Sequence, residues 1–261
     1  MSLSPKNEEI LQSLISMAKR GNLVGAFDDI PSVVYNDPRM PGVRSGLIKS
    51  IVEKSYNHYL YEGVKNERAL FFGSAFHAYV TDFEEFTTEY RKDLSGEEIK
   101  KIGLMHKKLI EHPDVKPRLQ NAKFEVTFFS QCQVTGLLKR CRVDLLQKDL
   151  STLEELNDFK TCKSASPSAF GKDARFFLYR ISAAYYLGIV SEVLGRYVRN
   201  FNLIPSEKEE PYESAVYRID DKSIAKGEEE ALKGLKILKE IYQSGDSAWK
   251  GYELGVRDLV I

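Results

Sequence analysis

The sequence predicts an α/β protein in which a central mixed β-sheet is flanked by helices. Several segments alternate apolar and polar residues with the period of a strand, at 123–130, 134–145, 153–160, 198–204 and 213–219. A long helical pattern interrupts them, from residue 167 to about 194. Ser166 at its N-cap and Pro167 at its first position are strong start signals. Strands interleaved with helices in this way are typical of the α/β class.

The length and composition indicate one domain over residues 1–261, with a short N-terminal helical extension over about 1–25. Hydrophobic residues make up 43% of the chain, enough for a sizeable core, and no repeat or low-complexity linker divides it. No window reaches the ~18 apolar residues of a membrane span. The N-terminus lacks the basic and apolar regions of a secretory signal. Cys132, Cys141 and Cys162 lack metal-finger spacing, so we expect reduced thiols in a cytoplasmic protein.

The segment before the sheet is expected to be mostly helical, with helices at 6–20, 46–59, 68–80 and 97–112. An irregular stretch rich in proline and aspartate separates the first two. Ser45 is expected to cap the second helix. With Arg44 and Lys49 beside it, this helix start is either a phosphate site or an ordinary capped helix. Asp220 or Asp221 is expected to cap a final amphipathic helix over about 222–243.

The stretch from 134 to 163 concentrates the residues with chemical potential. Strand alternation places Asp158 and Lys160 on one face and turns Phe159 into the core. Asp144 ends the preceding strand and meets them if the two strands pair. Mg²⁺ prefers such carboxylate oxygens, and a lysine beside it can orient or deprotonate a water and stabilise charge on a phosphate. Taken alone, the pattern is equally explained by a hairpin with a surface salt bridge.

The wider run GLLKRCRVDLL…LNDFKTCKSASPSAF resembles the core of the PD-(D/E)XK nuclease superfamily. The branch it resembles contains exodeoxyribonuclease VIII and the lambda-type recombination exonucleases, related to the RecB nuclease domain. The matching residues are Gly136, Arg142, Asp144, Asp158 and Lys160, followed by the helix that starts at Pro167. The resemblance covers about residues 27–252 and implies a restriction-endonuclease-like fold. It also implies a Mg²⁺ site, with Mn²⁺ able to substitute, held by Asp144, Asp158 and the Phe159 carbonyl.

Two further residues are candidates for the metal site. FGSAFHAYV resembles the family's G-x-x-x-H helix, which implies that His77 joins the metal site and that Gly73 lets its helix approach the sheet. Without the resemblance, a satisfied core histidine is the expected role of His77. Glu125 is either a second-sphere acid or an ordinary edge-strand glutamate. The remaining histidines are expected at the surface: His58, His106 and His112.

The expected DNA contacts lie near the starts of the helices at 46 and 167, and just after Lys160 in the strand that also carries Asp158. They are Arg44, Ser45, Lys49, Thr161, Lys163, Arg175, Tyr179 and Ser182. Tyr179, Ser182 and Tyr186 share a helix face, and the tyrosines could instead be packing residues. The family has a Y-x-x-Q pattern with glutamine where this chain has Ser182. Either Ser182 makes fewer contacts near the scissile phosphate than the family's glutamine, or water or Tyr185 makes those contacts instead.

The resemblance implies a Mg²⁺-dependent exodeoxyribonuclease that degrades linear double-stranded DNA 5′ to 3′. It would leave single-stranded 3′ overhangs for phage-type homologous recombination and work with an annealing protein of the RecT/Redβ type. The alternatives are an endonuclease or single-strand nuclease of the same superfamily, or a catalytically inactive DNA-binding scaffold. Lys plus Arg and Asp plus Glu number 38 each, which argues mildly against a nucleic-acid partner, although a local basic channel matters more than the sum.

A ring-shaped homo-oligomer, a trimer or tetramer around DNA, is also expected. Related recombination exonucleases form such rings, and encirclement would hold a neutral protein on its substrate. The acidic loop at 207–210 and the basic helix faces around 100–108 are candidate complementary surfaces. The tail around Trp249 resembles a W-x-G-Y turn with which the family often ends.

Overall fold

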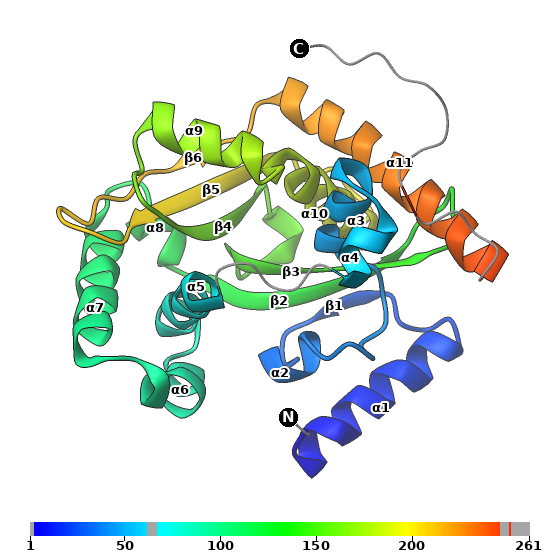
Figure 1. The fold of residues 1–261 in the computed structure, drawn as a ribbon, viewed down its shortest axis with the longest axis horizontal. Coiled ribbons are helices and arrows are strands. Elements are labelled where there is room, and N and C mark those ends of the chain that lie inside the picture. The colour runs from blue at the N-terminus through cyan, green and yellow to red at the C-terminus, as the bar shows by residue number, and fades with distance from the viewer. Residues whose placement is uncertain (1–2, 62–66, 246–250, 252–261) are drawn as a thin grey trace.

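The computed structural model describes residues 3–61, 67–245 and 251, and its centre is a six-stranded mixed sheet (Figure 1). The strands lie in chain order and are β1 (Gly25–Phe27), β2 (Ala122–Gln131), β3 (Leu138–Gln147), β4 (Glu155–Cys162), β5 (Asn200–Glu207) and β6 (Tyr217–Arg218). Only β4 and β5 run parallel, while the other neighbours are antiparallel. The predicted fold class is therefore confirmed.

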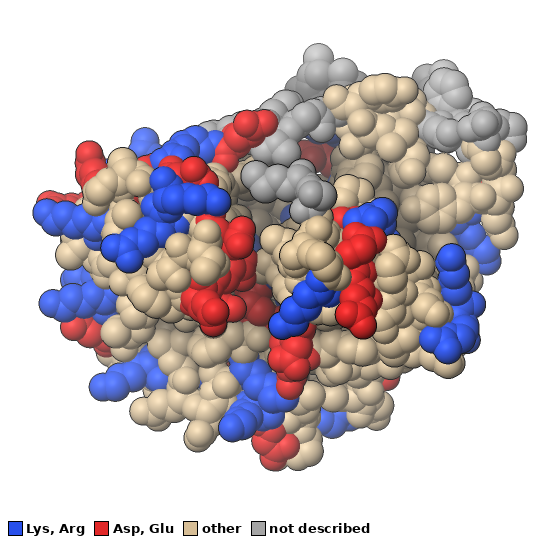
Figure 2. All heavy atoms as spheres, turned by 90° about the horizontal axis from the view of Figure 1, so that it is seen from below, with Lys and Arg blue, Asp and Glu red and all other residues tan. Residues whose placement is uncertain are grey.

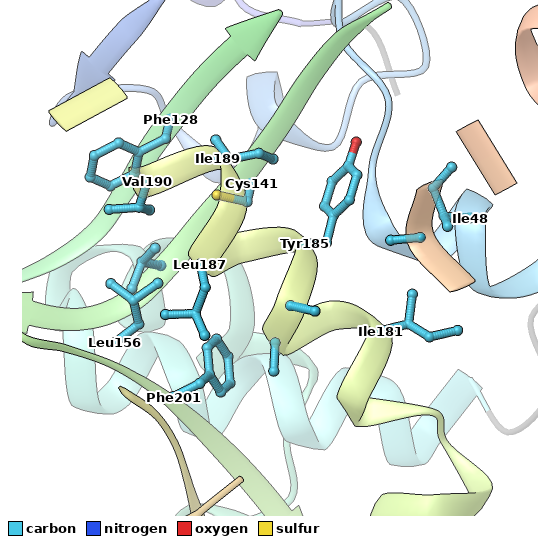
Figure 3. Close-up of a cluster of buried hydrophobic side chains, with 14 of the residues drawn as sticks. Ile48, Phe128, Cys141, Leu156, Ile181, Tyr185, Leu187, Ile189, Val190 and Phe201 are labelled. Atoms are coloured by element: carbon cyan, nitrogen blue, oxygen red, sulfur yellow. The ribbon is translucent and has the colours of Figure 1, made fainter. Parts of the chain in front are cut away.

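One face of the sheet is covered by the helices α3 (Ser45–Glu53), α9 (Pro167–Phe176), α10 (Tyr179–Leu194) and α11 (Asp221–Ser244). α10 lies directly on the strands, and its Leu187 and Val190 lie among Phe128, Leu156 and Phe201 of the sheet (Figure 3). All five side chains are almost completely buried. Burial of this apolar area is the main favourable contribution to folding.

The opposite face packs against α5 (Glu67–Thr81) and α7 (Gly96–Glu111). Phe76 and Met105 from these helices meet Leu145, Phe159 and Ile204 from three neighbouring strands. Short elements complete this layer, namely α6 (Phe83–Glu85), η1 (Phe86–Tyr90), η2 (Arg91–Asp93) and α8 (Lys116–Leu119). α5 thus places His77 beside Asp144 of β3 and Phe159 of β4.

The N-terminal segment covers another part of β2, on the face of the sheet opposite α10 (Figure 1). α1 (Pro5–Lys19) and α2 (Ser32–Tyr35) bury Leu11 and Val34 in a cluster that includes Phe129 of β2. β1 pairs with β2 through Gly25 and Phe129, in a stretch for which no strand was predicted. The helical extension expected over about 1–25 therefore contains both a helix and the start of a strand.

Two predicted helices are each broken into two. Instead of one helix over 46–59, α3 ends at Lys54 and α4 (Tyr56–Tyr61) follows. The helix expected from 167 to 194 ends at Phe176, and α10 begins after Leu178, whose φ of +53° is left-handed. Apolar periodicity continues across both breaks, so the pattern alone does not reveal them.

Three local predictions also need correction or lie outside the described residues. Arg44, not Ser45, occupies the N-cap of α3, and it makes no side-chain capping bond. Residues 133–137 form a turn in which Gly136 has a φ of +73°, so β3 begins at Leu138 rather than at 134. Asp220 caps α11 as predicted. The tail around Trp249 lies outside the described residues.

Close helix packing behind α10 depends on Gly227. A Cβ built at Gly227 on α11 would lie 2.2 Å from the Arg180 carbonyl oxygen on α10, closer than real atoms approach.

Among the residues that the structure describes, no helix combines the length and apolar character that crossing a membrane requires. The three cysteines are buried free thiols, as expected.

Candidate active site

The candidate site lies where the side chains of β2 and β3 stop alternating regularly between the two faces of the sheet. On β3, Val143 packs against one face of the sheet, but Leu145, two residues further on, packs against the other. Across on β2, Glu125 has a φ of +55° and lies between the pairs Phe124–Leu145 and Val126–Val143. A left-handed glutamate within a strand is rare and costs of the order of 1–3 kcal/mol. Because the register is the same on both sides of this distortion, Glu125 lies opposite Asp144.

The next strand supplies the acid and the lysine that were predicted to share a face. Asp158 Oδ2 and Lys160 Nζ form an ion pair, while Phe159 between them is fully buried. β4 is linked to β3 at this point, because the Phe159 amide donates a hydrogen bond to Asp144 Oδ2 (2.8 Å). Asp144, Asp158 and Lys160 therefore converge as predicted, in a largely buried place rather than on a surface hairpin.

His77 connects the two strands from the α5 side. Its Nε2 lies 2.7 Å from the Phe159 carbonyl oxygen, and its Nδ1 lies 3.5 Å from Asp144 Oδ2. Nε2 must carry a hydrogen to donate to the carbonyl, so a favourable contact on the other side needs a proton on Nδ1 or on Asp144. Gly73, one turn earlier, faces Thr161 of β4, and a Cβ there would lie 3.4 Å from Thr161 Oγ1, close to an ordinary contact distance.

Glu125 belongs to the site itself. One ligand atom from each of His77, Glu125 and Asp144 lies within 4.8 Å of the others. β1 pairs with β2 only from Thr127 to Phe129, so Glu125 lies just beyond that pairing, and its place beside His77 and Asp144 favours a role in the site. Its Oε2 lies 2.5 Å from Arg142 Nε, and this buried oxygen accepts no aligned hydrogen bond.

Behind Glu125, a polar network reaches the N-terminal layer. Arg142 donates to Ser32 Oγ (2.7 Å), and Ser32 Oγ donates to Glu85 (2.9 Å). The guanidinium of Arg142 also lies 4.6 Å from the ring centroid of Tyr35. The sequence identified Arg142 only as part of a motif and gave no signal for Ser32 or Glu85, which lie 110 and 57 positions away from it along the chain.

Crowded carboxylates dominate the electrostatics. Burial first, and then the neighbouring Asp158 carboxylate, raise the pKa of Asp144 to about 7. Burial alone would lower the pKa of Lys160, but Asp158 and Asp144 outweigh it and raise that pKa above its ordinary value. Lys160 is therefore an ammonium at neutral pH. It can stabilise negative charge or orient a water, but it is a poor base.

This donor set fits a divalent cation. Buried carboxylates that repel each other are stabilised by a nearby positive charge, and Mg²⁺ or Mn²⁺ takes oxygen ligands. Glu125 Oε2 and Asp158 Oδ2 are both buried without an aligned hydrogen bond, so each retains acceptor capacity. The residues able to hold the cation are Asp144, Asp158 and Glu125, with the Phe159 carbonyl and His77 adjacent.

Among the predicted DNA contacts, Lys49 and Tyr179 lie beside the catalytic cluster. Lys160 Nζ lies 5.4 Å from the ring centroid of Tyr179, and Lys49 Nζ lies 5.7 Å from the same centroid. Burial and the charge of Lys160 lower the pKa of Lys49 to about 8. A negatively charged phosphate in this position would offset the repulsion between the two ammonium groups.

Other predicted contacts are placed differently. Ser45 is buried, whereas Arg44 bonds to Asn36 and lines a separate pocket of about 550 Å³ with Arg140. Thr161 and Ser182 are half-buried, and Lys163 and Arg175 are exposed. Tyr185 cannot replace a glutamine, because its buried hydroxyl donates to the Val43 carbonyl (2.8 Å) within the core (Figure 3). Tyr186 packs on Phe201, as its alternative role predicted.

The surface charges are mixed and partly paired. On the face shown in Figure 2, basic and acidic side chains are interspersed, and acidic ones gather across the middle. Lys101 Nζ lies 2.9 Å from Glu209, and Lys108 Nζ lies 3.2 Å from Glu213. The acidic loop and the basic helix face therefore meet within one chain. Pairing of these surfaces between copies stays a prediction.

The remaining histidines are half-buried rather than surface residues. His106 packs against the ring of Tyr79 at a centroid distance of 5.1 Å, and His58 Nδ1 lies 2.7 Å from Ser55 Oγ. His112 Nδ1 accepts a hydrogen bond from the Asp114 amide. Each has a local structural role.

The mixed sheet carries Asp144, Asp158 and Lys160 where its strands are distorted. This combination is typical of a PD-(D/E)XK nuclease domain. Residues 50–249 match the family described as a PDDEXK-like domain of unknown function (DUF3799), and the chain belongs to this family. The superfamily predicted from the sequence is thus confirmed. PD-(D/E)XK nucleases generally use divalent metals, in agreement with the acidic cluster.

The fold is also that of a solved structure, a putative exonuclease from Eubacterium rectale. The TM-score is 0.67 at 14% sequence identity, and the match covers 89% of this chain and 96% of that one. A second structure, SSO0001, covers 72% of this chain and 84% of its own at 17% identity, but its TM-score of 0.31 supports no argument. No curated protein sequence matches the chain.

Proposed function

We propose that the protein is a Mg²⁺-dependent exodeoxyribonuclease that degrades linear double-stranded DNA from its ends, 5′ to 3′. The observation that carries this proposal is the convergence of Asp144, Asp158 and Lys160 on one partly buried volume, with Glu125 and His77 completing it. Three acids and a protonated lysine are suited to a phosphodiester, whose hydrolysis develops negative charge that must be neutralised.

Each residue has a separate task in hydrolysis. Asp144, Asp158 and Glu125 would hold the cation, which would polarise the phosphate and make a bound water more acidic. Lys160 remains an ammonium beside Asp158 and stabilises charge on the phosphate while orienting the attacking water. His77 fixes the Phe159 carbonyl and lies beside the Asp144 carboxylate, so it helps to position both groups.

Mg²⁺ is the proposed metal, with Mn²⁺ as a substitute. The donors are mainly carboxylate and carbonyl oxygens, which hard cations prefer, and a single imidazole is compatible with Mn²⁺. No cysteine takes part, since all three thiols are buried and none belongs to the cluster found among the described residues. These donors favour a hard cation such as Mg²⁺ over a soft, thiolate-binding metal.

The proposed biological role is end resection in phage-type recombination. The resemblance to recombination exonucleases supports it, and so does the neutral net charge, because a neutral enzyme benefits from enclosing its substrate. The product would be a 3′ overhang passed to an annealing protein of the RecT/Redβ type. The enzyme would form a trimeric or tetrameric ring in the cytoplasm of a bacterial cell.

A single set of reactions tests the proposal. Linear duplex, circular duplex and single-stranded DNA are incubated with the protein, with Mg²⁺ or with EDTA, and Lys160→Ala serves as the inactive control. Loss of linear duplex alone, in Mg²⁺ alone, is the expected result. Cutting of circles would mean an endonuclease, and cutting of single strands alone a single-strand nuclease. No cutting by the wild-type protein would mean a non-catalytic DNA-binding scaffold.

A further inference from the structure

Two exposed phenylalanines stand at the break between α9 and α10. Phe176 is 71% exposed and Phe177 is 49% exposed, which is unusual for neighbouring large apolar residues. The left-handed Leu178 that follows turns the chain so that its own side chain packs against the core. A left-handed leucine is strained, and such strain is often retained at functional sites.

These rings are continuous with the catalytic cluster. The Phe177 ring stacks on Tyr179, with centroids 5.8 Å apart and planes inclined by 24°. Tyr179 in turn lies under Lys160 Nζ, at 5.4 Å. Phe176 meets Phe177 edge to face at 5.1 Å. A ladder of aromatic rings therefore leads from the catalytic lysine to the surface.

The backbone of the ladder is held in place. Lys49 Nζ donates to the Phe177 carbonyl (3.3 Å), and the Phe177 amide donates to the Asp173 carbonyl (2.8 Å). Lys49 and Lys160 also place two positive charges beside Tyr179. A fixed aromatic surface next to positive charge is the combination that binds single-stranded nucleic acid, by stacking on bases and attracting phosphates.

We propose that Phe176 and Phe177 form a stacking platform for an unpaired base in the strand whose phosphate lies at Lys160. The proposal rests on the proposed nuclease function and specifies the form of DNA that the site accepts. A ring can stack on the face of a base only where that face is free, as in a single strand or an opened duplex end. The nucleotides next to the scissile bond are therefore held out of the double helix.

The positive neighbours favour a nucleic acid over a second protein chain as the occupant. A protein interface is depleted in charged residues at its core. Here Lys49 donates to the Phe177 carbonyl, and Lys160 lies over Tyr179 beside its partner Asp158. Arg175 is exposed on α9. A single nucleic-acid strand fits these neighbours, because its phosphates can meet the basic groups and its bases can stack on the rings.

The first test measures binding without cleavage. The affinity of the metal-free protein for a short fluorescein-labelled oligothymidine is measured by anisotropy, for the wild type, Phe177→Ala and the double variant Phe176→Ala/Phe177→Ala. The expected loss is roughly 5- to 100-fold. Tyr197→Ala is the matched control, since Tyr197 is a 65% exposed aromatic beyond the far end of α10 and should bind normally. Unchanged affinity of the double variant would overturn the platform, whether or not the protein is a nuclease.

The second test separates a platform from a general defect. Cleavage in Mg²⁺ is compared on a blunt duplex and on the same duplex with mismatched terminal pairs. The Phe177→Ala variant should be slowed about tenfold on the blunt end and much less on the mismatched end, where the base is already free. Equal slowing on both ends would overturn the proposal. Light scattering that shows a smaller oligomer with normal DNA affinity would assign the rings to a protein interface instead.

If the wild-type protein binds the oligonucleotide through the two rings but cuts no DNA, the proposed function fails and the platform stands. If it cuts DNA and the double variant binds and cuts normally, the platform fails and the function stands. The two outcomes are therefore distinguishable.

Discussion

Asp144 is expected to destabilise the metal-free protein at neutral pH, so Asp144→Asn should stabilise the fold while abolishing activity. Burial and Asp158 raise the pKa of this carboxyl from 3.8 to about 7. The native state therefore holds the proton more tightly than the unfolded state does. Its stability is unaffected below about pH 4 and decreases as the pH rises from there to about 7. Asparagine carries no charge, and its side-chain oxygen can still accept from the Phe159 amide.

The size of the pKa shift of Asp144 sets the expected gain in stability of Asp144→Asn. At 1.36 kcal/mol per pKa unit, moving from 3.8 to about 7 corresponds to at most about 4 kcal/mol. Relaxation of the site and the lost contact geometry of asparagine reduce this, so a gain of about 1–3 kcal/mol is expected above pH 7. For a chain of this length, each kcal/mol raises the melting temperature by roughly 2–4 °C.

The assay is thermal unfolding in EDTA from pH 4 to pH 8, for the wild type, Asp144→Asn and the control Asp29→Asn, which changes an exposed carboxylate. The advantage of Asp144→Asn should be near zero at the acidic end and should increase with pH. Mg²⁺ should raise the melting temperature of the wild type and not of the variant. An Asp144→Asn protein that is less stable than the wild type at pH 8, or whose advantage is the same at every pH, would refute the reasoning.

Three further changes have defined outcomes. Lys160→Ala should lower the cleavage rate by about 10²–10³ or more with an unchanged Mg²⁺ titration; activity within tenfold of the wild type would exclude its assigned role. Glu125→Gln should weaken Mg²⁺ binding, measured by calorimetry, and an unchanged affinity would return Glu125 to a purely structural role. Gly227→Ala should lower the melting temperature by several degrees without changing the Mg²⁺ requirement, because its Cβ would collide with the Arg180 carbonyl; an unchanged melting temperature would contradict that packing.

The part of the site that the sequence predicts correctly depends on local geometry. Asp158, Phe159 and Lys160 are adjacent, so strand alternation alone determines that the charged pair shares a face and the ring is buried. The position of Asp144 follows once two neighbouring strands pair. The sheet and its flanking helices are similarly readable, because their apolar periods are long and regular.

What the sequence does not reveal depends on contacts between distant segments. Glu125 adopts a left-handed backbone inside a strand, which no glutamate propensity predicts and which only the surrounding sheet can impose. The breaks at Lys54 and Leu178 fall within continuous helical patterns, so tertiary packing decides them. The pairing of Lys101 with Glu209 joins segments 108 positions apart, and composition cannot show that these charges meet within one chain.

The most direct test of the central claim, that this cluster is a metal-dependent hydrolytic centre, is to locate the metal. Crystals of the protein soaked in Mn²⁺ would be measured at a wavelength where manganese scatters anomalously. The account predicts an anomalous peak in contact with the Asp144 carboxylate and adjacent to Asp158 and the Phe159 carbonyl, and no such peak in Asp144→Asn crystals. A Mn²⁺ peak elsewhere on the protein, or none at saturating Mn²⁺, would contradict it.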